Sequence, residues 1–273
     1  MVGFLLLSLY GRAIAFLPSR YTSLLCKLVA RVAVMTSLRS RVERGIRQFP
    51  LTKDDDVEDL ARKHIRFLVD VFHKLLFVRY HPSPRHRVAN EVSFENEGYL
   101  KEALMDKRGV ILLSIHMGNF IWSICDLSLL YPTNLLVRAE KRPRWESFGA
   151  KAREKFQIKT IYSEGAGLKI KDKLRNGEIV VFLIDQYVLP FFHGPDHPFR
   201  KIIPRLAKIT SAPVIPFYTV ENGTHIIGRF LPPLKETSAA ALEDMAVQIV
   251  KERPHLWFWW RRMGKVRRSH VHN

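Results

Sequence analysis

Short apolar runs alternate with stretches of helical periodicity from residue 88 to residue 251, and this alternation limits the fold more than any other feature. The runs that we expect to be strands lie at 88–94, 110–115, 134–138, 159–162, 179–184, 214–219 and 225–230. The stretches that we expect to be helices lie at 97–107, 119–130, 145–156, 167–175, 201–210 and 239–251. Because the apolar runs are mostly continuous, their strands are expected to be buried on both faces. We therefore predict an α/β fold with a mostly parallel sheet flanked by helices.

The first 80 residues follow a different pattern. Residues 20–47 have the period of one amphipathic helix that ends before Pro50. A second helix is predicted from Thr52 to about Tyr80, with acidic residues at 54–56 in its first turn, where negative charge suits the helix dipole. We therefore divide the chain into N-terminal helices at 1–80 and an α/β domain at 81–273, and we expect the α/β domain to be a single folding unit.

The charge of the chain favours a polyanionic partner. The sequence has 44 Lys and Arg against 26 Asp and Glu, a formal net charge of +18. Basic side chains are concentrated with large apolar ones at residues 1–48 and 251–273. That mixture is typical of a surface that meets anionic headgroups and acyl chains, whereas a nucleic-acid binder would more often mix its basic residues with small polar ones. We expect residues 1–80 to associate with an anionic membrane surface, and we expect no nucleic-acid partner.

Residues 2–17 are apolar apart from Ser8 and Arg12. They lack the charged start and the small-residue cleavage site of a signal peptide, and Arg12 interrupts a stretch that is short for a span. We expect a helix that lies in the membrane interface; a short span with Arg12 snorkelling is the alternative. Cys26 and Cys125 lie in apolar helical contexts, which indicates small buried hydrophobes in a reducing compartment. No spacing of ligands predicts a metal site.

Two predicted strands end in residues capable of proton chemistry. The run at 110–115 leads into His116, and the run at 179–184 leads into Asp185. Ligands of parallel sheets bind at the carboxyl ends of the strands, so the two side chains are expected to meet there. A histidine oriented by a carboxylate can take a proton from a nucleophile. Gly118 allows a tight turn, and the helix that starts near Asn119 would offer N–H groups to an oxyanion or a phosphate. Taken singly, His116 and Asp185 are also compatible with structural caps.

A resemblance to a known family extends along most of the sequence. The segment from Gly109 through His116 to Phe120 resembles the active-site strand and histidine of the bacterial lipid A secondary acyltransferases, the lauroyl and myristoyl acyltransferases, which are lysophospholipid acyltransferase-like. Further segments in the same order also resemble that family: Arg138-Ala139-Glu140-Lys141-Arg142-Pro143, Arg153, the run from Lys173 into Asp185-Gln186, Pro190-Phe191-Phe192-His193-Gly194, Leu206-Ala207 with Ala212-Pro213-Val214-Ile215-Pro216, and Trp257 to Arg262. The resemblance implies a glycerolipid acyltransferase-like fold.

The resemblance also implies roles for single residues. His116 would be the catalytic base, and Arg138, Lys141, Arg153 and Gln186 would bind substrate. Arginine forks suit a phosphorylated acceptor or the phosphopantetheine of a thioester donor, although a solvated surface charge is equally compatible with Arg138 and Arg153.

One departure from the family pattern puts catalysis in question. The family has an acid five residues after the histidine, and this chain has Ile121 there. Asp126, ten residues beyond His116, would be about 15 Å away along a helix. Three interpretations follow: Asp185 is the carboxylate partner of His116, or His116 acts unassisted, or the protein keeps lipid binding without transferase chemistry.

The resemblance implies an enzyme that moves a fatty acyl group from an acyl carrier protein or coenzyme A thioester to a hydroxyl or amine of an amphipathic, lipid-like acceptor. In this hypothesis no cofactor is bound, because the acyl thioester is a co-substrate. The expected location is the cytoplasmic face of the bacterial inner membrane, with a monotopic attachment or a single N-terminal span. The alternative is a non-catalytic lipid- or acyl-chain-binding homologue. A nucleic-acid-binding protein is a third hypothesis, motivated by charge alone.

Overall fold

The computed structural model describes residues 2–49, 56–189, 191–192 and 197–263. The chain divides into two compact units. The first contains the described parts of Met1–His81 and Val250–Asn273, and the second is Pro82–Ile249. The predicted division after residue 80 into membrane-associating helices and an α/β domain stays a prediction. The structure differs from it in grouping the C-terminal segment with the N-terminal helices.

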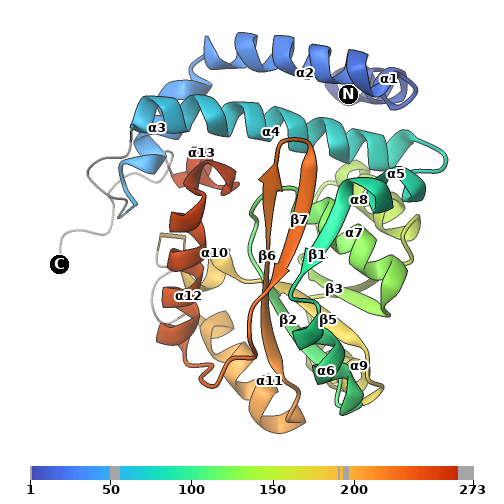
Figure 1. The fold of residues 1–273 in the computed structure, drawn as a ribbon, viewed down its shortest axis with the longest axis vertical. Coiled ribbons are helices and arrows are strands. Elements are labelled where there is room, and N and C mark those ends of the chain that lie inside the picture. Colours follow the sequence, from blue (N-terminus) through green and yellow to red (C-terminus); the bar gives the residue numbers. More distant parts are fainter. Residues whose placement is uncertain (1, 50–55, 190, 193–196, 264–273) are drawn as a thin grey trace. The chain divides into compact units, whose positions relative to one another are not determined.

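The second unit is built on a seven-stranded sheet (Figure 1). The strands are β1 (Val92–Glu95), β2 (Val110–Ser114), β3 (Thr133–Val137), β4 (Lys159–Tyr162), β5 (Ile179–Leu183), β6 (Val214–Asn222) and β7 (His225–Phe230). Their order is β1-β7-β6-β2-β5-β3-β4, and only the β6–β7 pair is antiparallel among the described strand pairs. The predicted α/β fold with a mostly parallel, helix-flanked sheet is therefore confirmed.

Most helices of this unit follow the predicted alternation. The helices are α5 (Arg85–Glu91), α6 (Gly98–Met105), α7 (Phe120–Leu130), α8 (Pro143–Glu154), α9 (Ala166–Arg175), α10 (Asp185–Val188), the 3₁₀ turn η1 (Pro198–Lys201), α11 (Ile202–Thr210) and α12 (Ala239–Glu252). Helices α5 and α10 are exceptions to the predicted alternation. Helix α7 packs on β1, β6 and β7, while α9 packs on β4 and β5. The short helix α10 and the turn η1 follow the predicted strand at 179–184, where no helix was predicted before residue 201.

The predicted strand at 88–94 is wrong over its first half. Residues 85–91 form helix α5, and only Val92–Glu95 extend the sheet as β1. Pro84 starts the helix, and Arg87 pairs with Glu91 one turn later at 2.7 Å. Such pairs four residues apart stabilise a helix and give no such support to a strand. Val88 is fully buried because it lies on the inner face of α5.

The middle of the sheet fixes the place where the chemistry was expected. Every residue of β2 is buried, and β2 lies between β6 and β5. Ser114 pairs with Leu183 on β5 and with Phe217 on β6. Strands β2 and β5 therefore end at the same level, so the residues that follow them are neighbours at the carboxyl edge of the sheet.

The first unit is helical. It contains α1 (Val2–Ala15), α2 (Ser19–Val34), α3 (Leu38–Ile46), α4 (Val57–Tyr80), the 3₁₀ turn η2 (Pro254–Leu256) and α13 (Trp260–Met263). Helices α1, α2 and α3 all pack on α4. Helix α4 begins at an Asp56 cap whose carboxylate accepts the N–H groups of Glu58 and Asp59. The predicted start at Thr52 lies outside the described residues.

The single helix predicted at 20–47 is wrong, because the chain breaks between α2 and α3 and turns by 78°. Thr36 causes the break locally: its hydroxyl donates to the Ala33 carbonyl and accepts the N–H of Leu38. Side-chain bonds of this kind replace the helical backbone bonds. Among the described residues no single helix is long and apolar enough to cross a membrane, whereas α2 and α3 taken together pass that test by length and composition.

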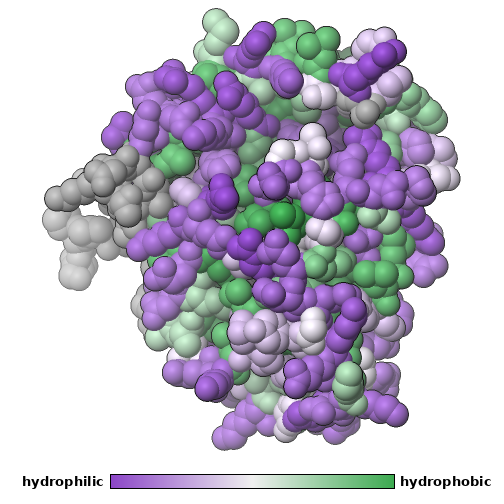
Figure 2. Space-filling view, viewed as in Figure 1, coloured by the Kyte–Doolittle hydropathy of each residue, from purple (hydrophilic) through white to green (hydrophobic). Residues whose placement is uncertain are grey.

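Apolar side chains face outward on α1 and α2. On α2, Leu24, Leu28 and Val32 follow one another at four-residue spacing and are more than half exposed. Figure 2 shows hydrophobic surface over these helices, between hydrophilic side chains. The aromatic segment at 257–260 is different, since Trp257 and Trp260 are fully buried and their rings pack on Phe49. These two tryptophans therefore belong to the core of the first unit.

Candidate active site

His116 and Asp185 lie side by side at the carboxyl edge of the sheet. The N–H of Ile184 donates to the Ser114 carbonyl at 2.9 Å, which extends the β2–β5 register to the following residues. One carboxylate oxygen of Asp185 lies 2.7 Å from Nδ1 of His116, and the other accepts the backbone N–H of His116 at 3.2 Å. Asp185 is fully buried, while the His116 side chain is 18% exposed.

This geometry determines what the imidazole can do. An ionised carboxylate only accepts hydrogen bonds, so Nδ1 of a neutral His116 carries the proton and Nε2 carries the lone pair. Two bonds from one carboxylate, to the ring and to the backbone of His116, also fix the direction of the ring. An imidazole held in this way is suited to general base chemistry at Nε2.

Gly118 and Asn119 form the turn between His116 and α7. Gly118 has a φ of +56°, and a Cβ atom there would lie 2.5 Å from the Thr219 carbonyl oxygen on β6. Only glycine fits this conformation and this close approach. Asn119 is 1% exposed, caps α7, and donates through its side chain to Glu221. The ring of Phe120, the first residue of α7, lies edge-on to the His116 ring at 5.1 Å. The first turn of α7 is thus next to the imidazole, as the predicted oxyanion role of its N–H groups requires.

Ile121 lies in the first turn of α7 and offers His116 no acceptor. The carboxylate on the imidazole comes instead from Asp185, on a separate strand end. Asp126 is farther along α7, where it is 6% exposed and burial raises its pKa to about 6. The prediction that His116 and Asp185 meet is confirmed, because both residues follow strands that are adjacent and parallel.

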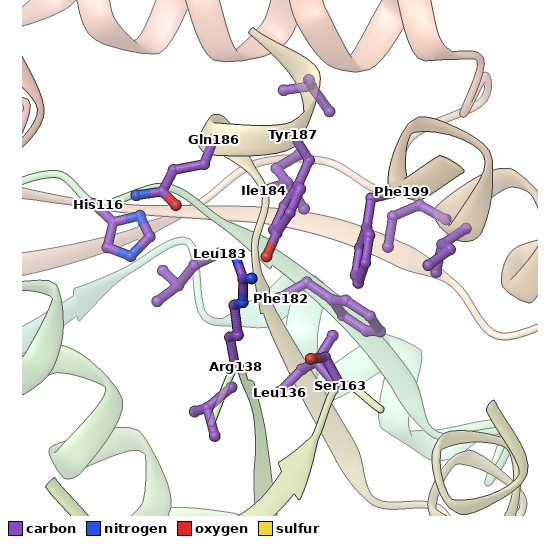
Figure 3. A pocket seen from close by; sticks show the side chains of 14 residues that line it. His116, Leu136, Arg138, Ser163, Phe182, Leu183, Ile184, Gln186, Tyr187 and Phe199 are labelled. Atoms are coloured by element: carbon purple, nitrogen blue, oxygen red, sulfur yellow. The ribbon is translucent and has the colours of Figure 1, made fainter. Parts of the chain in front are cut away.

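A cavity of about 200 Å³ opens beside the imidazole (Figure 3). Its lining is mostly apolar and is formed by His116, Leu136, Val137, Arg138, Ser163, Phe182, Leu183, Ile184, Gln186, Tyr187, Val188, Phe199, Ile202 and Ile203. In Figure 3, Gln186 lies beside His116, and Tyr187 and Phe199 lie across the cavity. The Arg138 side chain reaches into the space between His116 and these two rings. We call this space the His116 cavity. An apolar cavity with a few polar groups at one end suits a ligand with an apolar tail.

Aromatic rings form one wall of the His116 cavity. The rings of Tyr187 and Phe199 are stacked, with centroids 4.4 Å apart and planes 17° apart. Sequence reasoning missed this wall. Tyr187 and Phe199 lie in a proline-rich segment that has no helical or strand period, so no sequence signal placed them opposite His116.

A second, more open cavity of about 330 Å³ is lined by Arg138, Glu140, Arg142, Trp145, Glu146, Gly149 and Arg153. Arg138 lines both cavities, so they meet at its side chain. The guanidinium of Arg142 lies 5.8 Å from the Trp145 ring centre. This second cavity is the charged counterpart of the apolar His116 cavity.

The other residues predicted to bind substrate differ in whether they line a cavity and in whether they are already paired. Arg153 reaches the second cavity, but its guanidinium is held by Glu146 at 3.2 Å and Thr160 at 2.9 Å. Glu146 has a lowered pKa, first because the N–H of Glu140 donates to its carboxylate. The positive charge of Arg153 is therefore already balanced by the Glu146 carboxylate, whereas Arg138 is exposed to solvent. Gln186 lines the His116 cavity, and Lys141 is exposed and outside the lining of both cavities.

Comparison with known proteins gives two similarities. The family described as bacterial lipid A biosynthesis acyltransferase matches residues 2–265. A search of curated proteins found no match. Among solved structures, the chain is similar to the 1-acyl-sn-glycerophosphate (LPA) acyltransferase PlsC from Thermotoga maritima. The two are 15% identical, the alignment covers 84% of this chain and 94% of that one, and the TM-score is 0.38. A similarity of that size gives no information about the site.

Proposed function

Because this chain belongs to the bacterial lipid A biosynthesis acyltransferase family, we propose that it is an active acyltransferase with His116 as its base. In this proposal it moves a fatty acyl group from the thioester of an acyl carrier protein or coenzyme A to a hydroxyl or amine of a lipid-like acceptor. The observation that carries the proposal is the 2.7 Å hydrogen bond between Nδ1 of His116 and the fully buried carboxylate of Asp185. In this proposal Asp185 takes the place of the acid that the family has at position 121, where this chain has isoleucine.

The proposed reaction needs one base and one anion site. Nε2 of His116 takes the acceptor's proton while its oxygen or nitrogen attacks the thioester carbonyl. The carbonyl oxygen becomes negative in the tetrahedral intermediate, and N–H groups of the turn at Gly118 and Asn119 would stabilise it. The intermediate then expels the thiolate, which receives the proton from the imidazolium. Asp185 stabilises the charged imidazolium between these two steps.

The two cavities suit the two ends of such substrates. The His116 cavity, with its aromatic wall of Tyr187 and Phe199, would hold the acyl chain next to the imidazole. Arg138 lies at the junction with the second cavity, where it would bind a phosphate of the donor or acceptor. Arg153 is tied to Glu146, so in this proposal it shapes the second cavity rather than contacting the phosphate.

We also propose that the outward faces of α1 and α2 dock on an anionic membrane, at the cytoplasmic face of the bacterial inner membrane. Exposed Leu24, Leu28 and Val32 lie among exposed Arg20, Lys27 and Arg31 on α2. Leucine side chains can enter the acyl region while basic side chains meet the headgroups. The net charge of +18 also suits an acidic carrier protein.

The second candidate is a lipid-binding protein without transferase activity, and the observation that favours it is Ile121 in the acid position. The two candidates make different predictions for one substitution. We expect His116→Ala to abolish acyl transfer in the full chain, with a rate loss of about 10³-fold or more. Transfer is measured as thiol release from acyl carrier protein or coenzyme A thioesters, with a bacterial lipid extract as the acceptor and mass spectrometry of the lipid product.

His225→Ala is the matched control, because His225 on β7 bonds Ser93 on the edge strand β1. This variant is expected to retain the wild-type rate. A His116→Ala protein as fast as wild type, or a wild-type protein that binds acyl chains without releasing thiol, would establish the non-catalytic candidate.

A further inference from the structure

Arg200 is a buried arginine that directly follows Phe199 of the aromatic wall. It lies in η1 and is 7% exposed, although arginine is rarely buried without a partner. One nitrogen, Nη1, donates to the Val188 carbonyl, and the other, Nη2, pairs with Glu243 on α12 at 2.6 Å. All three residues belong to the unit Pro82–Ile249. The guanidinium thus joins three separate elements of one unit.

The carbonyl that Arg200 binds belongs to the last residue of α10. This helix has only four residues and begins at Asp185, the carboxylate on His116. Its own backbone bonds include the Leu189 N–H to the Asp185 carbonyl at 3.1 Å. So short a helix does not hold its shape without external support. The imidazole fixes one end of α10, and Arg200 fixes the other with a positive charge at the helix C-terminus, where charge of that sign is favourable.

The same contacts join the two segments of the aromatic wall. Tyr187 and Val188 on α10 line the His116 cavity, and so does Phe199, the residue before Arg200. The Tyr187 and Phe199 rings are stacked across these segments at 4.4 Å. Glu243 connects the arginine to α12, which has 14 residues. The position of the wall therefore depends on the Arg200–Glu243 pair.

We propose that Arg200 and Glu243 are positioning residues for acyl transfer, which hold α10 so that Asp185 stays on His116 and the aromatic wall limits the length of the acyl chain. Neither residue touches the reacting atoms. The catalytic part of this inference rests on the proposed function, whereas the structural part concerns α10 alone and can be tested without turnover.

The structural test is amide hydrogen exchange of the full chain, followed by mass spectrometry. In Arg200→Met, we expect the amides of 185–189 to exchange at least about tenfold faster than in wild type, since local opening follows the loss of the contacts that close a segment. Glu243→Gln keeps a neutral acceptor and is expected to give a smaller increase. Arg229→Met is the control, because Arg229 forms a comparable 2.7 Å pair with Glu95 at the edge of the sheet.

Unchanged exchange at 185–189 in both Arg200→Met and Glu243→Gln would overturn the proposal. If Arg200→Met fails to fold, Arg200→Lys replaces it, since lysine can keep one of the two bonds. Exchange that rises equally throughout the chain, or equally in Arg229→Met, would show general destabilisation and would also overturn the positioning role.

The functional test compares thioesters of different acyl length. Misplacement of a reacting group by about 1 Å can lower a rate by about 10²-fold, so we expect kcat of Arg200→Met to fall by about 10- to 100-fold. The ratio of kcat/KM for the preferred chain to that for a longer chain is expected to fall as well, because a loosened wall admits the longer chain. An unchanged ratio in a folded variant whose α10 has opened would overturn the role in length selection. If wild type and His116→Ala show the same transfer, the proposed function fails, while the exchange result still decides the role of the pair in holding α10.

Discussion

In the proposed reaction the carboxylate of Asp185 has two roles, and one substitution removes both. The carboxylate would keep the proton of His116 on Nδ1, and it would stabilise the imidazolium that forms during the proposed transfer. Asp185→Asn has the same shape, but its amide can donate to Nδ1 and so place the proton on Nε2, where the base must act. We expect kcat/KM for acyl transfer to fall by about 10³- to 10⁴-fold without loss of fold.

Thiol-release kinetics measure this loss, and circular dichroism verifies the fold. Arg229→Lys on β7 is a control that changes a partner of another carboxylate, Glu95. If Asp185→Asn retains most of the wild-type rate, His116 acts unassisted.

Ile121 gives a second prediction at the residue scale. Restoring an acid at this position is not expected to raise the rate of transfer. The substitution Ile121→Asp would place a charge at a half-buried position in the first turn of α7, while Nδ1 of His116 already bonds Asp185. Burying a charge without a partner is unfavourable. We expect transfer no faster than wild type and a free energy of unfolding lower by about 1–3 kcal/mol. Urea unfolding and thiol release measure the two quantities. A clear gain in rate would mean that Asp185 does not serve the imidazole.

Helix α7 carries a buried acid whose ionisation opposes folding. Asp126 is 6% exposed, and burial raises its pKa to about 6 from an ordinary value near 3.8. The folded state therefore favours the protonated acid. The resulting stability is fully present below about pH 4 and is lost as the pH rises through about 6.

Asp126→Asn removes this titration. Relative to wild type, we expect it to raise the free energy of unfolding on the order of 2 kcal/mol above about pH 7 and to change it little near pH 4. Urea unfolding of both proteins across this pH range measures the difference. A difference independent of pH, or one that is larger in acid, would contradict the assignment.

Elements were predictable from the sequence wherever one periodicity dominated. Strands β4 and β7 lie at the predicted residues, and the other strands except β1 lie within a few residues of theirs, because their apolar runs are bounded by turns. Residues 88–91 were misjudged because four residues are too few to separate a strand from a helix stabilised by an Arg87–Glu91 pair. The break at Thr36 depends on side-chain bonds to the backbone, and no periodicity reveals them.

The candidate site was predictable in part for a related reason. Strand order brings His116 and Asp185 together. The sequence shows where each strand ends, and in parallel sheets the carboxyl ends of neighbouring strands form the usual place of a site. Tyr187, Phe199 and Arg200 belong to short helical turns that depend on tertiary contacts, such as the bond from Arg200 to the Val188 carbonyl. Their positions in space depend on residues far along the chain, such as Glu243, which pairs with Arg200. The local sequence does not reveal such contacts.

At the scale of the whole molecule, charge and apolar surface would be separable contributions to the proposed membrane binding. The net charge of +18 acts over a distance that salt shortens, from about 10 Å at 0.1 M to about 3 Å at 1 M. The apolar contribution comes from exposed side chains on α1 and α2, and salt does not screen it. A membrane-docking protein of this kind should therefore bind anionic vesicles more tightly than neutral ones at low salt and keep a residual affinity at high salt.

Two exposed leucines on α2 test the apolar contribution. Leu24 and Leu28 are 67% and 57% exposed, so changing both to Asp should leave the fold intact while placing charge where acyl chains would lie. We expect cosedimentation with phosphatidylglycerol vesicles to fall at every salt concentration, and the residual binding at high salt to disappear. Ile209→Asp is the matched control, because Ile209 is 60% exposed on α11, in the other unit. Equal binding by the double variant and wild type, or an equal loss in Ile209→Asp, would mean that the outward face of α2 is not the docking surface and that charge alone brings the protein to the membrane.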